Sequence, residues 1–410
     1  MNGLQFNKRT ILLHPFVVFS IIWFSVAILY SLHLSNVLLF PTRDVIEITS
    51  YIYLPFVLTI TFYSAIRYLT RLGYHVRPKI TRINFDLLER RLSIWFRVWL
   101  IITIAEIFLS GGIPVIWLVL HSTKTYAEFG IHSLHGLANS LLLSIAVCRF
   151  ALFLISGKRK HLRIPVFAVV WSILVITRQV MLTSLLEYAV IFLSIKSIRL
   201  RTVARIAVAI AAFVLLFGVV GDLRSGGETF RSVAQPTERY PEWLPSGVLW
   251  VYIYFTTPIN NLIYAMPSVQ PVDSLFFPNT VSSLFPTVLR SIIFHDQAAD
   301  ATSTLLVTEA FNVSTAYNGP FQDFGLFGIM LFSAFTAFAC QFFWYRTSLR
   351  DTLIFAVLIQ CLAFTLFDNL FFLLPVIAQL LWLYYFFMPR ICLGNKSKSW
   401  SASSSSLPRF

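Results

Sequence analysis

The sequence predicts an all-α protein, a polytopic integral membrane bundle of about 10 to 12 transmembrane helices with a large extracytoplasmic loop domain. The composition is the first observation: of 410 residues, 57% are hydrophobic and only 12% are charged. The second is the length of the apolar segments, which far exceeds the roughly ten-residue alternating strands of a membrane β-barrel. The third is the gathering of basic residues in alternate gaps between these segments.

Apolar segments that suit membrane spans recur from the N-terminus to residue 389. They are expected over residues 13–33, 46–68, 93–110, 132–154, 164–179, 180–196, 203–221, 321–345, 352–370 and 371–389. The first segment lacks a small-residue cleavage site, so it is expected to be a membrane helix rather than a signal peptide. With the N-terminus in the cytoplasm, basic runs such as "GKRKHLR" and "KSIRLR" fall inside, as the positive-inside rule requires.

The same pattern divides the chain into four parts. Residues 1–221 form an N-terminal transmembrane bundle, 222–320 a large periplasmic loop, 321–390 the C-terminal transmembrane helices, and 391–410 a disordered cytoplasmic tail rich in serine. Within the loop, residues 245–293 are apolar but carry no basic residue before Arg290 that would mark a cytoplasmic turn. We expect re-entrant or surface-lying helices there, with two extra spans as the alternative.

Neither the net charge nor the cysteines indicate a nucleic acid, a metal or a cofactor. The formal net charge of +14 is explained by cytoplasmic loops rather than by a nucleic-acid surface. The four cysteines are Cys148, Cys340, Cys361 and Cys392, and they form no CxxC pair. No histidine stands at metal-ligand spacing to them, so we expect neither a disulfide nor a bound metal.

Residues 164–195 carry two ionisable side chains, Arg178 and Glu187, inside an apolar run. As one helix these residues would be about 48 Å long, against a hydrocarbon core of about 30 Å. We therefore expect two shorter helices that form a hairpin, with its turn near Arg178 at the outer face. Arg178 then either extends to lipid headgroups or lines an anion site, and Glu187, deep in the apolar slab, either pairs with a basic group or serves the site.

Four other arginines are expected on the same outer side as Arg178. Arg224, Arg231, Arg239 and Arg290 all fall in the long external loop. A planar guanidinium binds a diphosphate through paired, charge-assisted hydrogen bonds. These five arginines are therefore the candidate pyrophosphate-binding residues.

Four stretches together resemble the Wzy-type O-antigen and oligosaccharide repeat-unit polymerases. They are "AEIFLSGGIPVIW" with "TYAEFGIHSLHGL", "LVITRQVMLTSL", "GVVGDLRSGG", and "NVSTAYNGPFQDFGLFGIML". The similarity covers most of residues 95–390, and it depends on the order and spacing of the stretches rather than on one motif.

The resemblance implies a C-type membrane glycosyltransferase in the bacterial inner membrane, working on its periplasmic side without a metal. Its substrate would be a polyprenyl-pyrophosphate-linked oligosaccharide, and its partners the lipid bilayer, a chain-length regulator and a flippase. By this resemblance Arg178 and Arg224 would hold the pyrophosphate, with Arg231, Arg239 and Arg290 as weaker candidates.

The acceptor hydroxyl of such a reaction needs a base near the outer face. The candidates are Asp222, Asp323, Glu187 and His295. Asp323 lies in "YNGPFQDFGLFG", where the alternative is a plain helix entry with a carboxylate at the positive helix end. Glu106, one turn before "GGIP", raises the same choice between pairing and catalysis.

Aromatic residues of the external loop are candidates for contacts with sugar rings. They are Trp243, Tyr252 and Tyr254, and the alternative is an aromatic belt at the membrane interface. Two other functions remain open: an O-antigen ligase, with the same chemistry and a different acceptor, and a flippase of the lipid-linked oligosaccharide. The absence of an internal repeat argues against a transporter.

Overall fold

The computed structural model describes most of the chain. It covers residues 10–71, 84–131, 133–196, 208, 227–269, 271, 277–294, 306–308 and 310–388. Every regular element in these ranges is a helix. An isolated antiparallel β-bridge joins Ser35 to Pro236. The all-α prediction is therefore confirmed. The expected span at 203–221 (Val208 apart), the tail at 391–410, and the candidate residues Asp222, Arg224 and His295 lie outside the described residues.

The helices follow the expected spans closely. The longer ones are α1 (Pro15–Ser31), α2 (Thr42–Arg71), α3 (Phe85–Ser110), α5 (Leu134–Ser156), α6 (Arg163–Leu174), α7 (Arg178–Ile195), α10 (Ser246–Ala265), α14 (Asn318–Trp344), α15 (Leu349–Ala363) and α16 (Leu374–Phe386). Short helices are α4 (Pro114–Val119), α9 (Gly227–Ala234), α11 (Pro278–Val281) and α12 (Thr287–Phe294). Single 3-10 turns are η1 (Ile11–Leu13), η2 (Tyr126–Glu128), η3 (Arg159–Leu162), η4 (Met266–Ser268), η5 (Ser282–Leu284), η6 (Phe364–Leu366) and η7 (Leu370–Phe372).

Six helical stretches of the described residues are long and apolar enough to cross a membrane. They are Thr42–Thr70, Phe85–Val119, Leu134–Ser156, Arg178–Ile195, Asn318–Trp344 and Leu349–Leu366, and α1 and α16 are shorter apolar helices. Their number is compatible with a multi-pass membrane protein. The count of about 10 to 12 spans remains a prediction, since α6 has only 12 residues.

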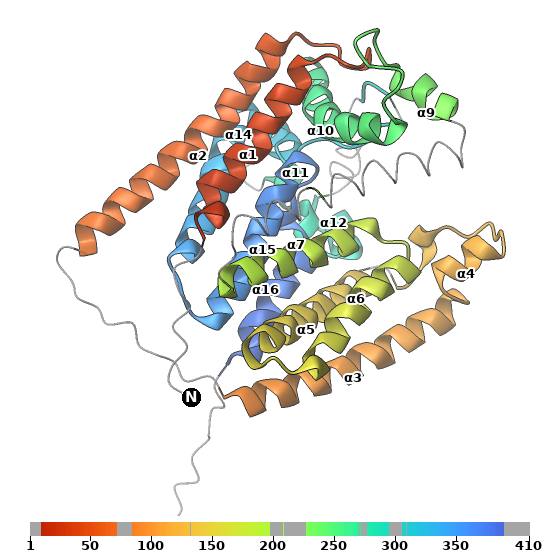
Figure 1. The fold of residues 1–410 in the computed structure, drawn as a ribbon, viewed down its shortest axis with the longest axis vertical. Coiled ribbons are helices and arrows are strands. Elements are labelled where there is room, and N and C mark those ends of the chain that lie inside the picture. The colour runs from red at the N-terminus through yellow and green to blue at the C-terminus, as the bar shows by residue number, and fades with distance from the viewer. Residues whose placement is uncertain are drawn as a thin grey trace, which may run out of the picture.

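The expected hairpin at 164–195 is present. α6 ends at Leu174 and α7 begins at Arg178, with the turn at residues 175–177. The helices α5, α6 and α7 pack against one another as consecutive antiparallel segments (Figure 1). The N-termini of α5 and α7 therefore lie at the same end of the bundle.

α16 runs parallel to α5, because a Cβ on Gly136 would lie 3.0 Å from Pro375 at the start of α16, while Ser144 approaches the Gln379 carbonyl further along. We call the end where α5, α7 and α16 begin the outer end. The opposite end, where η3 and the C-termini of α14 and α16 lie, is the inner end. The names follow the orientation expected from the basic loops.

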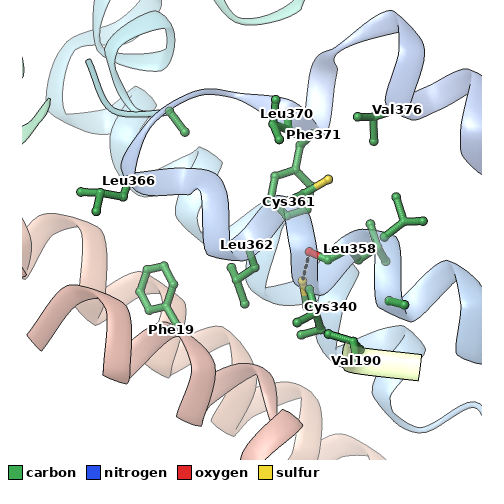
Figure 2. Close-up of a cluster of buried hydrophobic side chains, with 14 of the residues drawn as sticks. Phe19, Val190, Cys340, Leu358, Cys361, Leu362, Leu366, Leu370, Phe371 and Val376 are labelled. Atoms are coloured by element: carbon green, nitrogen blue, oxygen red, sulfur yellow. Dashed lines mark hydrogen bonds between the residues drawn. The ribbon is translucent and has the colours of Figure 1, made fainter. Parts of the chain in front are cut away.

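α15 lies in the middle of the molecule, between α1, α7, α14 and α16. In its membrane-compatible stretch, 83% of the residues are buried. Figure 2 shows Phe19 of α1, Val190 of α7 and Cys340 of α14 around Leu358 and Cys361 of this helix. The three cysteines of the described residues, Cys148, Cys340 and Cys361, are all buried as free thiols.

Candidate functional site

The loop between α3 and α5 folds over the outer end and is held against α3 by hydrogen bonds. Gly111 ends α3 in a left-handed conformation, with φ at 74°. The Lys124 ammonium donates to the Ser110 carbonyl at 2.8 Å, and the Gly130 N–H donates to the Ser110 hydroxyl at 2.9 Å. These bonds bring Gly130 back to the helix that the chain left about twenty residues earlier.

Where this loop joins its two flanking helices, Glu106 of α3 and His135 of α5 form a carboxylate–imidazole pair. Glu106 Oε2 lies 3.1 Å from His135 Nδ1, and Glu106 is only 1% exposed. The Ile131 N–H donates to the other carboxylate oxygen at 3.3 Å. A carboxylate that accepts the Nδ1–H fixes both the tautomer and the orientation of the ring. The lone pair is thereby left on Nε2.

The Nε2 atom of His135 also has a hydrogen-bond partner. Asn139, one turn further along α5, places its amide nitrogen 3.0 Å from Nε2 and donates to the lone pair there. The His135 side chain keeps 20% of its surface exposed. Glu106, His135 and Asn139 thus make an ordered row in which one imidazole nitrogen is oriented and the other can accept a proton.

Aromatic contacts connect this pair to the hairpin that carries Arg178. The Phe129 ring lies 5.2 Å from the His135 ring and 6.3 Å from Trp171, one turn before the end of α6. Phe129 is 6% exposed, so the connection is a packed one. Arg178 follows α6 across a three-residue turn. His135 and Arg178 therefore belong to the same end of the same three-helix unit.

The turn before Arg178 is strained. Ile176 has a φ of 57°, a conformation that costs a β-branched residue on the order of 1–3 kcal/mol. Thr177, at the N-cap of α7, makes no side-chain capping bond to the first N–H groups of this helix. Arg178 is exposed beside them. A cation at the positive end of a helix dipole is unfavourable alone and becomes favourable when an anion binds.

Arg239 lies elsewhere, in a polar hollow of about 350 Å³ beside the α1–α2 loop. The hollow lies between the α1–α2 loop and residues 234–240, and His33, Asn36 and Thr237 line it with Arg239. The Asn36 N–H donates to the Gln235 carbonyl at 2.8 Å, which joins the two loops. This hollow offers a guanidinium, an imidazole and an amide to one ligand.

The described arginines of the external loop do not gather in one place. Arg231 donates to the Glu242 carbonyl at 3.0 Å, and it belongs to α9 near the Arg239 hollow. Arg290 belongs to α12, which lies apart from α9 in Figure 1. The structure thus separates Arg178 from Arg239 and Arg231.

Asp323 is fully buried in the first turns of α14. Its carboxylate accepts four hydrogen bonds, from the backbone and side chain of Asn279 at 2.9 and 3.0 Å, and from the Thr280 N–H and hydroxyl at 2.8 and 2.5 Å. These bonds use all four lone-pair directions of a carboxylate. Asp323 therefore ties α11 to α14.

Glu187 is also fully buried, in the middle of α7. The Gln379 amide nitrogen of α16 donates to both of its carboxylate oxygens, at 2.9 and 3.0 Å. Among the described residues no basic side chain pairs with it. In place of the expected basic partner, Glu187 has a neutral amide from a neighbouring helix.

The three candidate aromatic residues differ in accessibility. Trp243 is 81% exposed and Tyr254 is 43% exposed, and Tyr254 lies 5.6 Å from the ring of Trp250. Tyr252 is 3% exposed, and its hydroxyl accepts the Leu34 N–H at 2.9 Å. Protein atoms cover the Tyr252 ring in this conformation, whereas Trp243 and Tyr254 are exposed.

His135 is the functional candidate that the sequence motifs did not single out. The stretch "TYAEFGIHSLHGL" contains it, but nothing in the sequence connects it to Glu106, 29 residues earlier. Among the described residues, no group of three or more His, Cys, Asp or Glu side chains is arranged to hold a metal ion.

Comparisons with family models, with curated proteins and with solved structures found no match to this chain.

Proposed function

We propose that the protein is a glycosyltransferase of the bacterial inner membrane that joins polyprenyl-pyrophosphate-linked oligosaccharide units into O-antigen or a related surface polysaccharide. The observation that carries the proposal is the oriented His135 imidazole, held by the buried Glu106 at the same end of the bundle as Arg178. A base and a guanidinium at one end of a membrane bundle are what this transfer requires.

In this proposal, His135 acts as the base. The acceptor hydroxyl displaces the Asn139 amide from Nε2, gives its proton to that nitrogen, and its oxygen attacks the anomeric carbon of the growing chain. Glu106 stabilises the imidazolium that forms and does not itself touch the substrate. A positioned base typically contributes about 10²- to 10⁴-fold to the rate.

The bond that breaks joins the anomeric carbon to the polyprenyl pyrophosphate. Because a pyrophosphate leaves as a stable anion, it needs a cation rather than a general acid. Arg178, beside the uncapped N-terminus of α7, supplies that charge. Binding of the anion would also relieve the unfavourable position of Arg178 at the positive end of the helix dipole.

The separation of Arg178 from Arg239 suits an enzyme with two lipid-linked substrates. Both the growing chain and the new unit carry a pyrophosphate, and the oligosaccharide of the new unit keeps its own pyrophosphate away from the reacting hydroxyl. The hollow of Arg239 would hold the second anion, with Trp243 and Tyr254 as the exposed aromatic surfaces for sugars.

The test is polysaccharide synthesis in a strain that lacks the gene and carries variants in its place. Glu106→Gln, His135→Gln and Arg178→Lys should each remove long-chain polymer and leave single repeat units on lipid A. Arg178→Lys keeps the charge and loses the bidentate fork. The matched control is His121→Asn, an exposed histidine of the same loop, which should keep the full ladder on a gel.

Protein levels in the membrane fraction separate loss of function from loss of folding. Long-chain polymer in a well-inserted His135→Gln strain would reject His135 as the base. Complete loss of saccharide from lipid A in the deletion strain would instead identify a ligase or a flippase.

A further inference from the structure

An apolar groove runs along the surface of the bundle between α14 and α16. Its volume is about 350 Å³, and apart from the Tyr384 hydroxyl its lining is entirely apolar. Phe335 and Phe343 of α14 form one wall, Leu381 and Tyr384 of α16 form the other, and Leu358 of α15 forms the floor. Phe335 is 43% exposed and Leu381 is 65% exposed, so the groove opens outward, toward the surrounding lipid.

The groove has a defined direction along the membrane-compatible helices. α14 and α16 are both antiparallel to α15, so their C-termini lie at the inner end. Phe343 and Tyr384, near these C-termini, mark the inner end of the groove, and Phe335 lies nearer the outer end.

Two guanidinium groups stack on aromatic rings at the inner end of the groove. Arg346 lies 5.8 Å from the ring of Phe343 and 4.1 Å from that of Phe342. Arg350 lies 5.0 Å from the ring of Tyr384. Stacking holds the plane of a guanidinium and leaves its N–H edge directed away from the ring.

Two guanidinium groups lie at this end. Arg350 uses Nε and Nη2 to bind Asp351 Oδ1, both at 3.1 Å, and Arg346 follows the last turn of α14. The inner end therefore combines a hydrocarbon surface with two arginine side chains at the depth where a helix leaves the bilayer.

We propose that this groove binds an anionic phospholipid of the inner leaflet, with an acyl chain between α14 and α16 and its phosphate on Arg346 and Arg350. Hydrocarbon chains have no preference for an apolar groove over bulk lipid, since lipid tails are as apolar as leucine. Selectivity must come from the phosphate–guanidinium contacts. A polyprenyl carrier engaged for the proposed reaction would place its pyrophosphate at the outer end, so the inner-end charges favour a phospholipid.

Native mass spectrometry of the detergent-purified protein can test this directly. The probes are dioleoyl-phosphatidylglycerol and dioleoyl-phosphatidylcholine, which share acyl chains and differ in net charge. The wild-type protein should retain phosphatidylglycerol over phosphatidylcholine. Arg346→Gln with Arg350→Gln should reduce the retained phosphatidylglycerol by about tenfold, as expected for the loss of charge-assisted bonds.

The matched control removes two positive charges from the same end of the bundle. Lys158→Gln with Arg159→Gln changes two exposed residues at η3 and should leave lipid retention unchanged. Ala339→Phe fills the groove without changing any charge, because Ala339 is one of its lining residues, and it should lower retention as well.

Equal retention of the two lipids by the wild-type protein would overturn the proposal. So would equal losses in the double variant and the Lys158/Arg159 control, or full retention in Ala339→Phe. Preferred retention of a polyprenyl phosphate over phosphatidylglycerol would assign the groove to the substrate carrier instead. None of these measurements depends on glycosyltransferase activity, so a failure here is distinct from a failure of the proposed function.

Discussion

Gly130 permits the contact on which the proposed base depends. Its φ of +85° lies in the left-handed region, and a Cβ at this position would stand 2.8–2.9 Å from three atoms of the His135 side chain. The absence of a side chain lets the loop backbone lie directly against the imidazole. The backbone thereby holds the ring from the side opposite to Asn139.

We expect Gly130→Ala to displace His135 and to remove polymer synthesis. Gly157→Ala is the matched control, because Gly157 also has a positive φ, +70°, but a Cβ there would meet nothing within 4 Å. Backbone strain should lower the stability of both variants by about 1 kcal/mol or more. A thermal melt compares the strain, and the polysaccharide gel compares the activity; equal activities in the two variants would contradict the role of the contact.

Individual site residues were only partly predictable from the sequence. Arg178 and Glu187 were recognised because a charge in an apolar run needs an explanation. The two partners of Asp323, Asn279 and Thr280, are not predictable, since they lie 44 and 43 residues earlier in a segment without a strong pattern. His135 was missed for the same reason: its partner Glu106 is brought near by the course of an irregular loop.

At the scale of elements, a group of charged side chains fastens α3 to the α5–α6 turn at the inner end. Arg149 of α5 donates to the Ser93 hydroxyl at 2.7 Å, and its other nitrogen lies 3.2 Å from His161 Nδ1. Glu89 of α3 receives Lys160 at 2.9 Å and approaches His161 Nε2 at 3.4 Å. Neutral His161 satisfies both contacts, accepting from Arg149 and donating to Glu89.

Acidification should weaken this junction. Burial lowers the pKa of His161 below its ordinary value of 6.5, and Glu89 only partly opposes this. The unfolded state therefore binds a proton more readily, so stability is present above about pH 6.5 and decreases as the pH falls below it. Protonation also places an N–H against the Arg149 guanidinium.

Thermal unfolding in detergent between pH 5 and 8 measures this effect. We expect the decrease at low pH to be smaller in His161→Gln, because this variant has no imidazole to protonate. His121→Asn changes an exposed histidine and should keep the wild-type slope. Identical slopes for wild type and His161→Gln would refute the assignment.

Helix boundaries differed from expectation where charges were involved. Hydropathy placed the start of the third span at residue 93, whereas α3 begins at Phe85. Asn84 caps it by accepting the Leu87 N–H at 3.0 Å. The charged residues that follow stay helical because they find partners on other elements, as when Arg91 binds the terminal carbonyls of Tyr385 and Phe386 in α16. A sliding hydropathy window contains no such information.

At the scale of the whole molecule, buried polar contacts hold the central helices in register. Glu187 and Gln379 join α7 to α16, the Gln360 amide lies 3.3 Å from the Thr183 hydroxyl between α15 and α7, and the Ser144 hydroxyl reaches the Gln379 carbonyl of α16 at 3.3 Å. Apolar packing provides little discrimination between helix rotations inside a lipid bilayer, so hydrogen bonds of this type fix the partners.

The orientation of the bundle can be tested by labelling. In a Cys392→Ser background the described cysteines are buried, so a new thiol at Thr123 or Lys158 reports its own position. Both residues are exposed, near the outer and the inner end respectively. We expect a membrane-impermeant maleimide to modify Thr123→Cys in intact spheroplasts and Lys158→Cys only after permeabilisation. The opposite pattern would invert the topology and remove the proposed site from the periplasm.

The loop between α1 and α2 has a consequence for biogenesis. Ser35 binds the Ala234 carbonyl, and Tyr30 binds Asn260 at 2.8 Å, across 199 and 230 residues of chain. At roughly 5–20 residues per second of translation, these partners emerge from the ribosome tens of seconds after the first hairpin has entered the membrane. The earliest part of the protein to be inserted is therefore among the last to be completed, and the nascent hairpin must persist through that interval without its final contacts.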